Sequence, residues 1–458
     1  MVKYNVILLT IDCLRADHLD CYGYHKQIAP NIADLADRGT LFMDVFSAGP
    51  YTKASFKTIF TGLYPFTKGG YHTIEHLVTL PEFLRKLNYK TYAIPNNVLL
   101  NRESGYSKGF DVYIDPIRKY SEHKELLRRM GGARILRLLD KIAPKLAERI
   151  RIHFVENPYL KAKDVVSLMI RHIVDAGRKP FFIWAHFMDA HFPYTYLPNI
   201  YFSINGERLK KTKLIKINRS IEQYLRFNKN LKNELIDEII KLYDTEIKYI
   251  DIYIGKLIEF LDQKSLLDNT IIIITADHGE EFMEHGAFGH SGERNISHMY
   301  QELLRVPLII YHPNYSSRIE KASVSSADIV PTIINSVSNT NIDIPFDGIS
   351  ILEKENLRNR ILFSEASLYN YKRGILRISP REKVALAVRI GKWKYIYYES
   401  HHIRDELYNL QEDPHEEKNL LDEHKDLTKT ILEEIIKRRL KRIRRDLLRC
   451  AIRRKIMS

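Results

Sequence analysis

Three side chains that could bind a metal ion stand where predicted strands end. Asp12 follows the apolar run Val6–Ile11, and Asp277 and His278 follow the run Ile271–Thr275. Because open α/β sheets bind ligands beyond the carboxyl ends of their strands, we expect the three to converge at one edge. Capping of a following helix is the alternative for either aspartate alone. Together, two carboxylates and an imidazole predict a site for Zn²⁺ or Mn²⁺.

The elements that must position these residues alternate along the chain. Short apolar runs predict buried strands at Val6–Ile11, Thr91–Ile94, Phe181–His186, Ile271–Thr275 and Pro307–Tyr311. Helical periodicity separates them at Asn31–Asp37, Leu80–Leu87, Asp164–Val174, Leu235–Leu261 and Asp328–Val337. This alternation predicts an α/β fold in which a mostly parallel central sheet carries helices on both faces.

The pattern changes near residue 355. Val384–Ile390 and Trp393–Tyr398 flank the turn Gly391-Lys392, which predicts a hairpin. We therefore expect a catalytic domain at 1–354 with a basic helical insertion at about 116–160. A smaller antiparallel C-terminal subdomain should follow at 355–425, and a basic amphipathic helical tail at 426–458.

Composition narrows the class of protein. The 458 residues are 45% hydrophobic and 28% charged, which excludes a disordered, collagen-like or coiled-coil chain. Three cysteines give no disulfide framework, which fits a reducing compartment. We find no signal peptide and no apolar run of the roughly 20 residues that cross a bilayer. These features predict a cytoplasmic protein.

The net charge of +14 is concentrated in two segments. Residues 118–151 carry +7 and residues 437–455 carry +10, and in the second segment Leu440, Ile443 and Leu447 recur at helical spacing. Such a helix could lie on an anionic membrane, here the inner face, or pack on the domain with a solvated basic face. Nucleic acid is not expected, because no nucleic-acid-binding motif accompanies the charge.

Motifs along the chain resemble those of the sulfatase family, within the alkaline phosphatase superfamily. They occur in the family's order at Asp12–Leu19, Thr52–Pro65, Met188–Tyr194, Thr275–Glu281 and Glu406–Leu410. The resemblance implies an alkaline-phosphatase-like sandwich and a covalent mechanism on a tetrahedral phosphorus or sulfur ester. Residues 118–160, 200–235 and the tail after 425 are peculiar to this chain.

The resemblance places Thr52 at the nucleophile position. Sulfatases carry Cys or Ser there, converted to formylglycine, with Arg four positions later, whereas this chain has Thr52 and Phe56. Threonine cannot become formylglycine, and a threonine nucleophile is similar to that of phosphodiesterases, lipoteichoic acid synthases and phosphoethanolamine transferases. Because a cation must activate such a hydroxyl, our hypothesis is a single divalent ion shared by Asp12, Thr52, Asp277 and His278. The alternative for Thr52 is a helix N-cap.

Other residues receive roles from the resemblance. His191 would protonate the leaving oxygen, and His290 would contact the transferring group or a second metal. Possible substrate contacts are Lys68, Asn96, Asn97 and His285. Cys13 stands where many sulfatases have a second metal-binding Asp, so the metal shell is one carboxylate short. Arg15 and Asp17 are expected to be structural partners.

The leading functional prediction is a metal-dependent hydrolase or transferase that cleaves phosphate mono- or diesters through Thr52. The cofactor would be one divalent ion, Zn, Mn, Ca or Mg, with a second left open. The substrate would be a small-molecule, lipid or glycan ester. The alternatives are a sulfuric ester hydrolase with an unusual nucleophile, and a catalytically silent family member that binds anionic surfaces.

Overall fold

Strand β1 (Asn5–Ile11) occupies the middle of an eight-stranded sheet and is buried along its whole length. The computed structural model describes residues 3–114, 159–227, 230–290, 296–338, 345–352, 357, 360–368 and 382–457. The sheet order is β11-β2-β10-β7-β1-β6-β4-β5. The other strands are β2 (Thr40–Phe42), β4 (Lys90–Ile94), β5 (Val112–Tyr113), β6 (Phe181–Phe187), β7 (Thr270–Ala276), β10 (Leu308–Tyr311) and β11 (Arg318–Glu320).

The sheet is mostly parallel, as predicted. Strand β10 is antiparallel to both of its neighbours, β7 and β2, and the other pairings of the sheet are parallel. The central strands are apolar without alternation, because helices cover both of their faces. The predicted strands and helices all occur, with ends within two residues of the expected ones.

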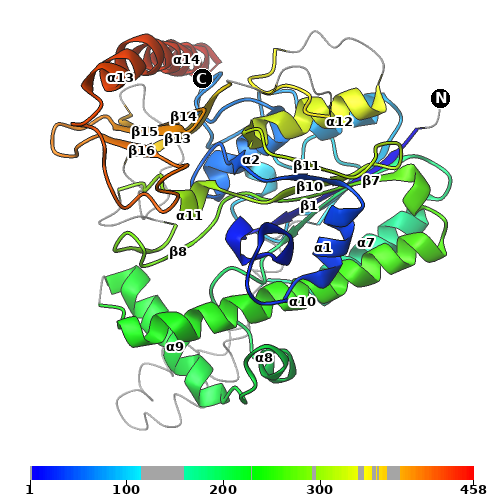
Figure 1. The fold of residues 1–458 in the computed structure, drawn as a ribbon. Helices are drawn as coiled ribbons and strands as arrows, with labels where there is room; N and C mark the ends of the chain where they lie inside the picture. Colours follow the sequence, from blue (N-terminus) through cyan, green and yellow to red (C-terminus); the bar gives the residue numbers. More distant parts are fainter. Residues whose placement is uncertain are drawn as a thin grey trace, which may run out of the picture.

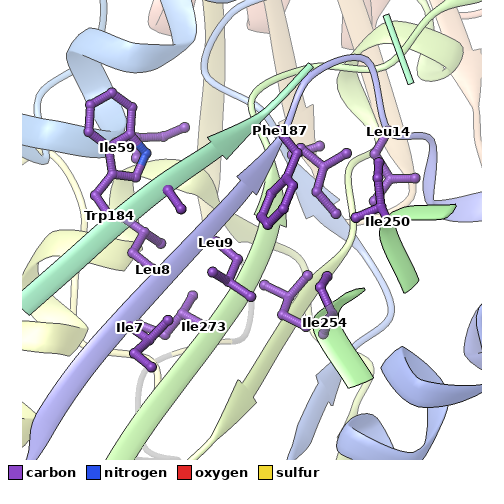
Figure 2. Packing of buried hydrophobic residues seen from close by; sticks show 14 of the residues in the cluster. Ile7, Leu8, Leu9, Leu14, Ile59, Trp184, Phe187, Ile250, Ile254 and Ile273 are labelled. Atoms are coloured by element: carbon purple, nitrogen blue, oxygen red, sulfur yellow. The ribbon is translucent and has the colours of Figure 1, made fainter. Parts of the chain in front are cut away.

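Helices form one layer on each face of the sheet (Figure 1). One layer contains α1 (Pro30–Asp37), α7 (Ala162–Ala176) and α10 (Ile236–Gln263). The other contains α2 (Thr52–Thr61), α3 (Leu80–Lys86) and α12 (Ile329–Val337). Figure 2 shows Ile250 and Ile254 of α10 on one side of β1 and Ile59 of α2 on the other. The two layers bury the core that fixes the carboxyl ends of the strands.

Shorter elements complete this part of the molecule. Helices α8 (Pro198–Asn205) and α9 (Lys211–Phe227) precede α10, and α11 (Gln301–Leu304) precedes β10. Two small sheets pair β3 (Val45–Phe46) with β12 (Val324–Ser325) and β8 (Glu281–Phe282) with β9 (Phe288–Gly289). The predicted basic insertion at about 116–160 lies almost entirely outside the described residues.

A second, antiparallel sheet lies in the C-terminal part of the chain. Its order is β13-β14-β15-β16, with bounds β13 (Ile361–Ser367), β14 (Val384–Ile390), β15 (Trp393–Tyr398) and β16 (Glu406–Asn409). The predicted hairpin is β14–β15. The sequence analysis did not identify β13 and β16 as strands.

The tail packs on this second sheet. It comprises α13 (Lys425–Thr430), a π-helical turn (Ile431–Ile436) and α14 (Lys437–Met457). Ile436, Ile443 and Leu447 are buried in one cluster with side chains of β14 and β15. The apolar seam of the tail is therefore used inside the molecule, which leaves a solvated basic face outside. No helix among the described residues is long and apolar enough to span a bilayer.

Candidate active site and metal centre

The register of three parallel strands brings Asp12 and Asp277 together. Ile11 at the end of β1 pairs with Ala276 of β7 on one side and with Phe187 of β6 on the other. The residues that follow these strands must therefore emerge side by side, as the sequence predicts. Figure 2 shows Phe187 near this end of β1.

Four predicted ligand residues meet around one ring nitrogen. The Nε2 atom of His278 lies 3.6 Å from Asp12 Oδ1, 3.4 Å from Asp277 Oδ2 and 3.3 Å from Thr52 Oγ1. These four side chains are at most 3% exposed. The arrangement brings together the donor atoms that were expected to share one divalent ion.

The donor set fits a divalent cation. Asp277 Oδ2 is buried and accepts no hydrogen bond from the described residues. The Nδ1–H of His278 donates to the carbonyl oxygen of Gly279 at 2.8 Å, which leaves the Nε2 lone pair for the site. Metal-ligating histidines commonly use this arrangement. A cation would partner the orphaned carboxylate oxygen.

The pKa values of the two carboxyl groups are shifted in opposite directions. Burial, together with the nearby Asp12, raises the pKa of Asp277 well above its ordinary range. Burial alone would raise the pKa of Asp12, but the hydrogen bond from His186 and neighbouring histidines hold it well below that range. Burial and His290 lower the pKa of His278 to about 4. These shifts favour the ionised form of Asp12 and the neutral forms of Asp277 and His278.

The second oxygen of Asp12 is occupied by two donors. Asp12 Oδ2 accepts from Asn97 Nδ2 at 2.9 Å and contacts His186 Nε2 at 3.1 Å. His186 Nδ1 contacts Thr10 Oγ1 at 2.9 Å, which fixes the ring. Asn97 was expected to contact substrate, and here it orients Asp12. The sequence analysis missed this role of His186, although it stands beside Thr10 in the register of β1 and β6.

The loop before α2 holds Thr52 in place. Tyr51 is the N-cap residue of α2 and Thr52 is its first residue, so the alternative interpretation of Thr52 as the cap is wrong. Ser47 Oγ donates to the carbonyl oxygen of Asp277 at 2.5 Å, and Ser55 Oγ donates to that of Gly49 at 2.7 Å. The Ser47 bond connects the segment before α2 to the loop that carries Asp277 and His278.

Two further histidines stand beside the cluster. The ring of His290 lies 4.5 Å from that of His278 and 5.4 Å from that of His191, centroid to centroid. Burial disfavours a charge on His290, but the Glu280 carboxylate, 2.9 Å from Nδ1, raises the pKa of His290 overall. Glu280 was not among the predicted site residues. His191 and His290, the two predicted catalytic histidines, therefore lie on the side of His278, which contacts Thr52.

The remaining predicted residues make contacts outside this cluster. His285 stacks on Tyr300, with centroids 3.7 Å apart, and pairs with Glu302 at 3.3 Å. Lys68 is exposed, and its backbone N–H donates to Asp446 of α14 at 3.0 Å. Asn96 exchanges two hydrogen bonds with the backbone of Leu160. Arg15 pairs with Asp17, as expected for structural partners.

Comparisons with known proteins agree with this geometry. A family model described as "Sulfatase" matches residues 4–337. A second model, described as "N-sulphoglucosamine sulphohydrolase, C-terminal", matches residues 284–446. The first match contains β1, α2 and β7, which carry the clustered residues.

Individual relatives share low sequence identity with this chain, but they match most of its length. Arylsulfatase K of Rattus norvegicus is 22% identical over 453 residues, covering 93% of this chain and 76% of the relative. Iduronate 2-sulfatase of Homo sapiens is 24% identical over 413 residues, covering 82% and 70%. The structure of a phosphonate monoester hydrolase of Agrobacterium radiobacter superposes with a TM-score of 0.72 at 19% identity, covering 96% of each chain. The chain belongs to the sulfatase family and is an ester hydrolase of that family.

Proposed function

We propose that this protein cleaves phosphate mono- or diesters through a covalent intermediate on Thr52, with release to water or to an acceptor alcohol. The observation that carries the proposal is the 3.3 Å separation of Thr52 Oγ1 and His278 Nε2 inside a buried carboxylate cluster. A divalent ion bound there would stabilise the Thr52 alkoxide and offset charge on a phosphoryl oxygen.

The chain's own residues would divide the remaining work. The Thr52 hydroxyl would lose its proton to solvent, and its oxygen would form the new bond to phosphorus as the bond between phosphorus and the ester oxygen breaks. The departing oxygen would take a proton from His191. The amino end of α2, where Thr52 stands, favours the anionic group being transferred. His191 donates a hydrogen bond from Nδ1 to the carbonyl oxygen of Phe192. Its Nε2 is therefore the nitrogen that would give a proton to the departing oxygen.

The residue four positions after Thr52 supports phosphoryl over formylglycine chemistry. Phe56 is fully buried and packs edge-on against His186, with ring centroids 4.9 Å apart. No cationic side chain therefore occupies the position of the family's arginine. Lys57 follows it but turns away, because its Nζ donates to the carbonyl oxygens of Pro65 and Gly70.

Sulfate-ester hydrolysis is the second candidate function. It is favoured by the names of the relatives, arylsulfatase K and iduronate 2-sulfatase. The first candidate is supported by the name of a relative with the same fold, a phosphonate monoester hydrolase. Under either candidate the natural substrate would be a small-molecule, lipid or glycan ester.

A substrate panel distinguishes these candidates. Nitrophenyl phosphate, bis-nitrophenyl phosphate and nitrophenyl sulfate are assayed with Mn²⁺ or Zn²⁺, using wild type, Thr52→Ala and Thr52→Ser. We expect a phosphate to be cleaved fastest, Thr52→Ala to lose turnover and Thr52→Ser to retain part of it. Phosphate on Thr52 should be trapped by rapid acid quench and detected by mass spectrometry. Much faster sulfate cleavage would overturn the phosphoryl assignment, and unchanged turnover in folded Thr52→Ala would exclude it as nucleophile.

We also propose that the outward face of α14 contacts an anionic membrane, as a peripheral protein of the cytoplasmic face would. Lys441, Arg445 and Arg449 are exposed at helical spacing. Leu448 and Ile452, 54% and 48% exposed, lie within the same stripe. Cations flanking exposed aliphatic side chains suit the boundary between headgroups and acyl chains.

A further inference from the structure

Helix α9 holds the loop that follows His191. Asn218 Oδ1 accepts a hydrogen bond from the backbone N–H of Tyr194 at 3.2 Å, and Asn218 Nδ2 donates to the carbonyl oxygen of Tyr194 at 2.9 Å. Tyr194 is three residues after His191, and the carbonyl oxygen of Phe192, between them, accepts from His191 Nδ1. The backbone that orients the His191 ring is therefore fixed to α9 by two hydrogen bonds.

The same helix holds the strand that precedes His290. Tyr224 Oη accepts a hydrogen bond from the backbone N–H of Phe288 in β9 at 3.2 Å, and the two rings meet edge to face with centroids 6.2 Å apart. In the part of the chain that the structure describes, β9 pairs with β8 alone, and Tyr224 takes one N–H group of β9. A Cβ atom at Gly289 would lie 3.5 Å from Leu225 Cδ2, so α9 also lies against the residue next to His290.

The helix that makes these contacts is itself anchored in the core. Leu214, Ile217 and Ile221 are at most 5% exposed and belong to the main hydrophobic cluster of the protein. Removal of these aliphatic side chains from water stabilises the docking of α9 on the domain. Because the helix is held in this way, Asn218 and Tyr224 can hold the backbone of other segments in a defined position.

The two histidines belong to loops that follow strands of different sheets. His191 follows β6 of the central sheet, and His290 follows β9 of a two-stranded sheet. No strand pairing joins these two sheets among the described residues, whereas α9 is hydrogen-bonded to both loops. The two rings lie 5.4 Å apart, centroid to centroid. Helix α9 lies within residues 200–235, which carry none of the family motifs identified above, so the resemblance does not account for this support.

We propose that Asn218 and Tyr224 are positioning residues, which place His191 and His290 for the reaction. The inference rests on the proposed function, in which His191 Nε2 gives a proton to the ester oxygen as the bond between phosphorus and that oxygen breaks. The two residues affect different parts of this step. Asn218 acts through His191 and therefore on the departing oxygen, whereas Tyr224 acts through His290 and therefore on the group being transferred.

The dependence of turnover on the leaving group tests the role of Asn218. Phenyl and nitrophenyl esters of phosphate are compared, as monoesters or as diesters according to which the wild type cleaves. A nitro group withdraws electrons from the departing oxygen, so the departure of that oxygen depends less on a proton. Asn218→Ala should lose at least about 10-fold more kcat on the phenyl ester than on the nitrophenyl ester, because general-acid catalysis contributes about 100-fold or more. His191→Ala should change this ratio of kcat values in the same direction. In the His191→Ala background, Asn218→Ala should not change the ratio further, since the two residues act as a unit.

Tyr224→Phe is a second variant, which removes a single oxygen atom. It should lower kcat on both esters by the same factor of about 10, since misplacement of a reacting group by about 1 Å can cost about 100-fold. Ser220→Ala is the matched control on the same helix, because Ser220 Oγ donates to the carbonyl oxygen of Lys216 within α9. This control should keep the wild-type kcat on both esters. Circular dichroism and thermal melting confirm that each variant is folded.

The outcomes separate this inference from the proposed function. If the ratio changes in His191→Ala but not in folded Asn218→Ala, the role of Asn218 is overturned and the proposed function stands. A further change of the ratio in the double variant would have the same meaning. An unchanged ratio in His191→Ala would remove both the proton donor and its support, while phosphate trapped on Thr52 would still identify the nucleophile. Equal losses in Tyr224→Phe and Ser220→Ala would overturn the role of Tyr224.

Discussion

Ser47 Oγ donates to the carbonyl oxygen of Asp277, at 2.5 Å, across 230 positions of sequence. This bond joins the loop that carries the proposed nucleophile to the loop that carries two proposed metal ligands. Thr52 Oγ1 is thereby held 3.3 Å from His278 Nε2. Preorganisation of this kind lowers the entropy lost on reaching the reactive geometry.

Asp277→Asn should abolish tight metal binding while sparing the metal-free fold. Asparagine resembles the protonated form of Asp277, the form that burial and Asp12 favour in the absence of a cation. We expect affinity for the divalent ion to fall by at least about 100-fold, since a direct ligand is lost. Urea unfolding in a chelator should show an unchanged or higher free energy of unfolding. A large loss of stability in the chelator would show that ionised Asp277 supports the metal-free fold.

Asn97→Ala should weaken metal binding through the orientation of Asp12. The Asn97 amide donates to Asp12 Oδ2 at 2.9 Å and contributes no ligand atom of its own in our assignment. The expected loss is about 10- to 100-fold in metal affinity, measured by calorimetry. The neighbouring Asn96→Ala is the matched control, because the side chain of Asn96 forms hydrogen bonds with the backbone of Leu160 instead of with Asp12. Equal losses in both variants would contradict the specific role of Asn97.

The sequence predicted the sheet and the ligand cluster because both follow from local pattern. Asp12, Asp277 and His278 each follow an apolar run, and parallel pairing then brings them to one edge. The contact between His186 and Asp12 was not predicted, because it depends on register: His186 stands opposite Thr10, and only the folded sheet directs its Nε2 atom to Asp12. Strand β10 is an apolar run whose composition does not depend on the direction of the chain, so its antiparallel pairing could not be predicted from its sequence.

The residues assigned by resemblance alone had mixed outcomes. His191 and His290 lie by the cluster, but Lys68 and His285 make their contacts with Asp446 and with Tyr300 and Glu302. Such contacts join segments far apart in sequence, and no local periodicity encodes them. The position of Glu280 could have indicated a role at the site, because it lies two residues after His278 within the motif Thr275–Glu281.

A buried carboxyl pair should make stability fall as pH rises. Burial raises the pKa of Glu246 to about 7, and repulsion from Asp189 adds to this effect. Burial raises the pKa of Asp189 to about 6. The folded state thus binds more protons than the unfolded state between about pH 4 and 7, so the free energy of unfolding decreases through that window. Glu246→Gln should remove part of this slope and stabilise the protein at pH 8 by about 1 to 3 kcal/mol.

Glu238→Gln is the control of opposite sign. Lys213 and Lys241 outweigh partial burial and lower the pKa of Glu238, so its contribution to stability is present at neutral pH and lost on acidification. Its replacement should therefore not stabilise the protein at pH 8. Urea unfolding between pH 5 and 8 measures both variants. A Glu246→Gln variant with the wild-type slope would show that this carboxyl is ionised throughout.

Arg439→Met should destabilise the packing of the tail on the second sheet. Arg439 is 5% exposed, pairs with the buried Glu365, and lies over the rings of Tyr64 and Phe363. Its loss leaves an uncompensated buried carboxylate, which costs about 3 to 5 kcal/mol. Arg438→Met is the matched control, since Arg438 and Glu434 are exposed and such pairs contribute less than about 1 kcal/mol. Similar melting temperatures for the two variants would contradict a structural role for the Arg439 pair.

Reversing charge on the outward face of α14 should release the protein from anionic vesicles. Lys441, Arg445 and Arg449 are changed together to Glu, and flotation is measured with phosphatidylserine-containing and neutral liposomes at low and high salt. Wild type should float only with the anionic vesicles and less at high salt, because salt screens exposed charges. A variant with Lys163, Lys210 and Lys211 changed to Glu carries the same net charge on other exposed positions and should still float. If both triple variants float alike, net charge rather than α14 governs binding; if wild type does not float, the membrane proposal fails.

Leu448→Ser with Ile452→Ser should reduce binding even at high salt, since the contribution of these exposed aliphatic side chains is insensitive to screening.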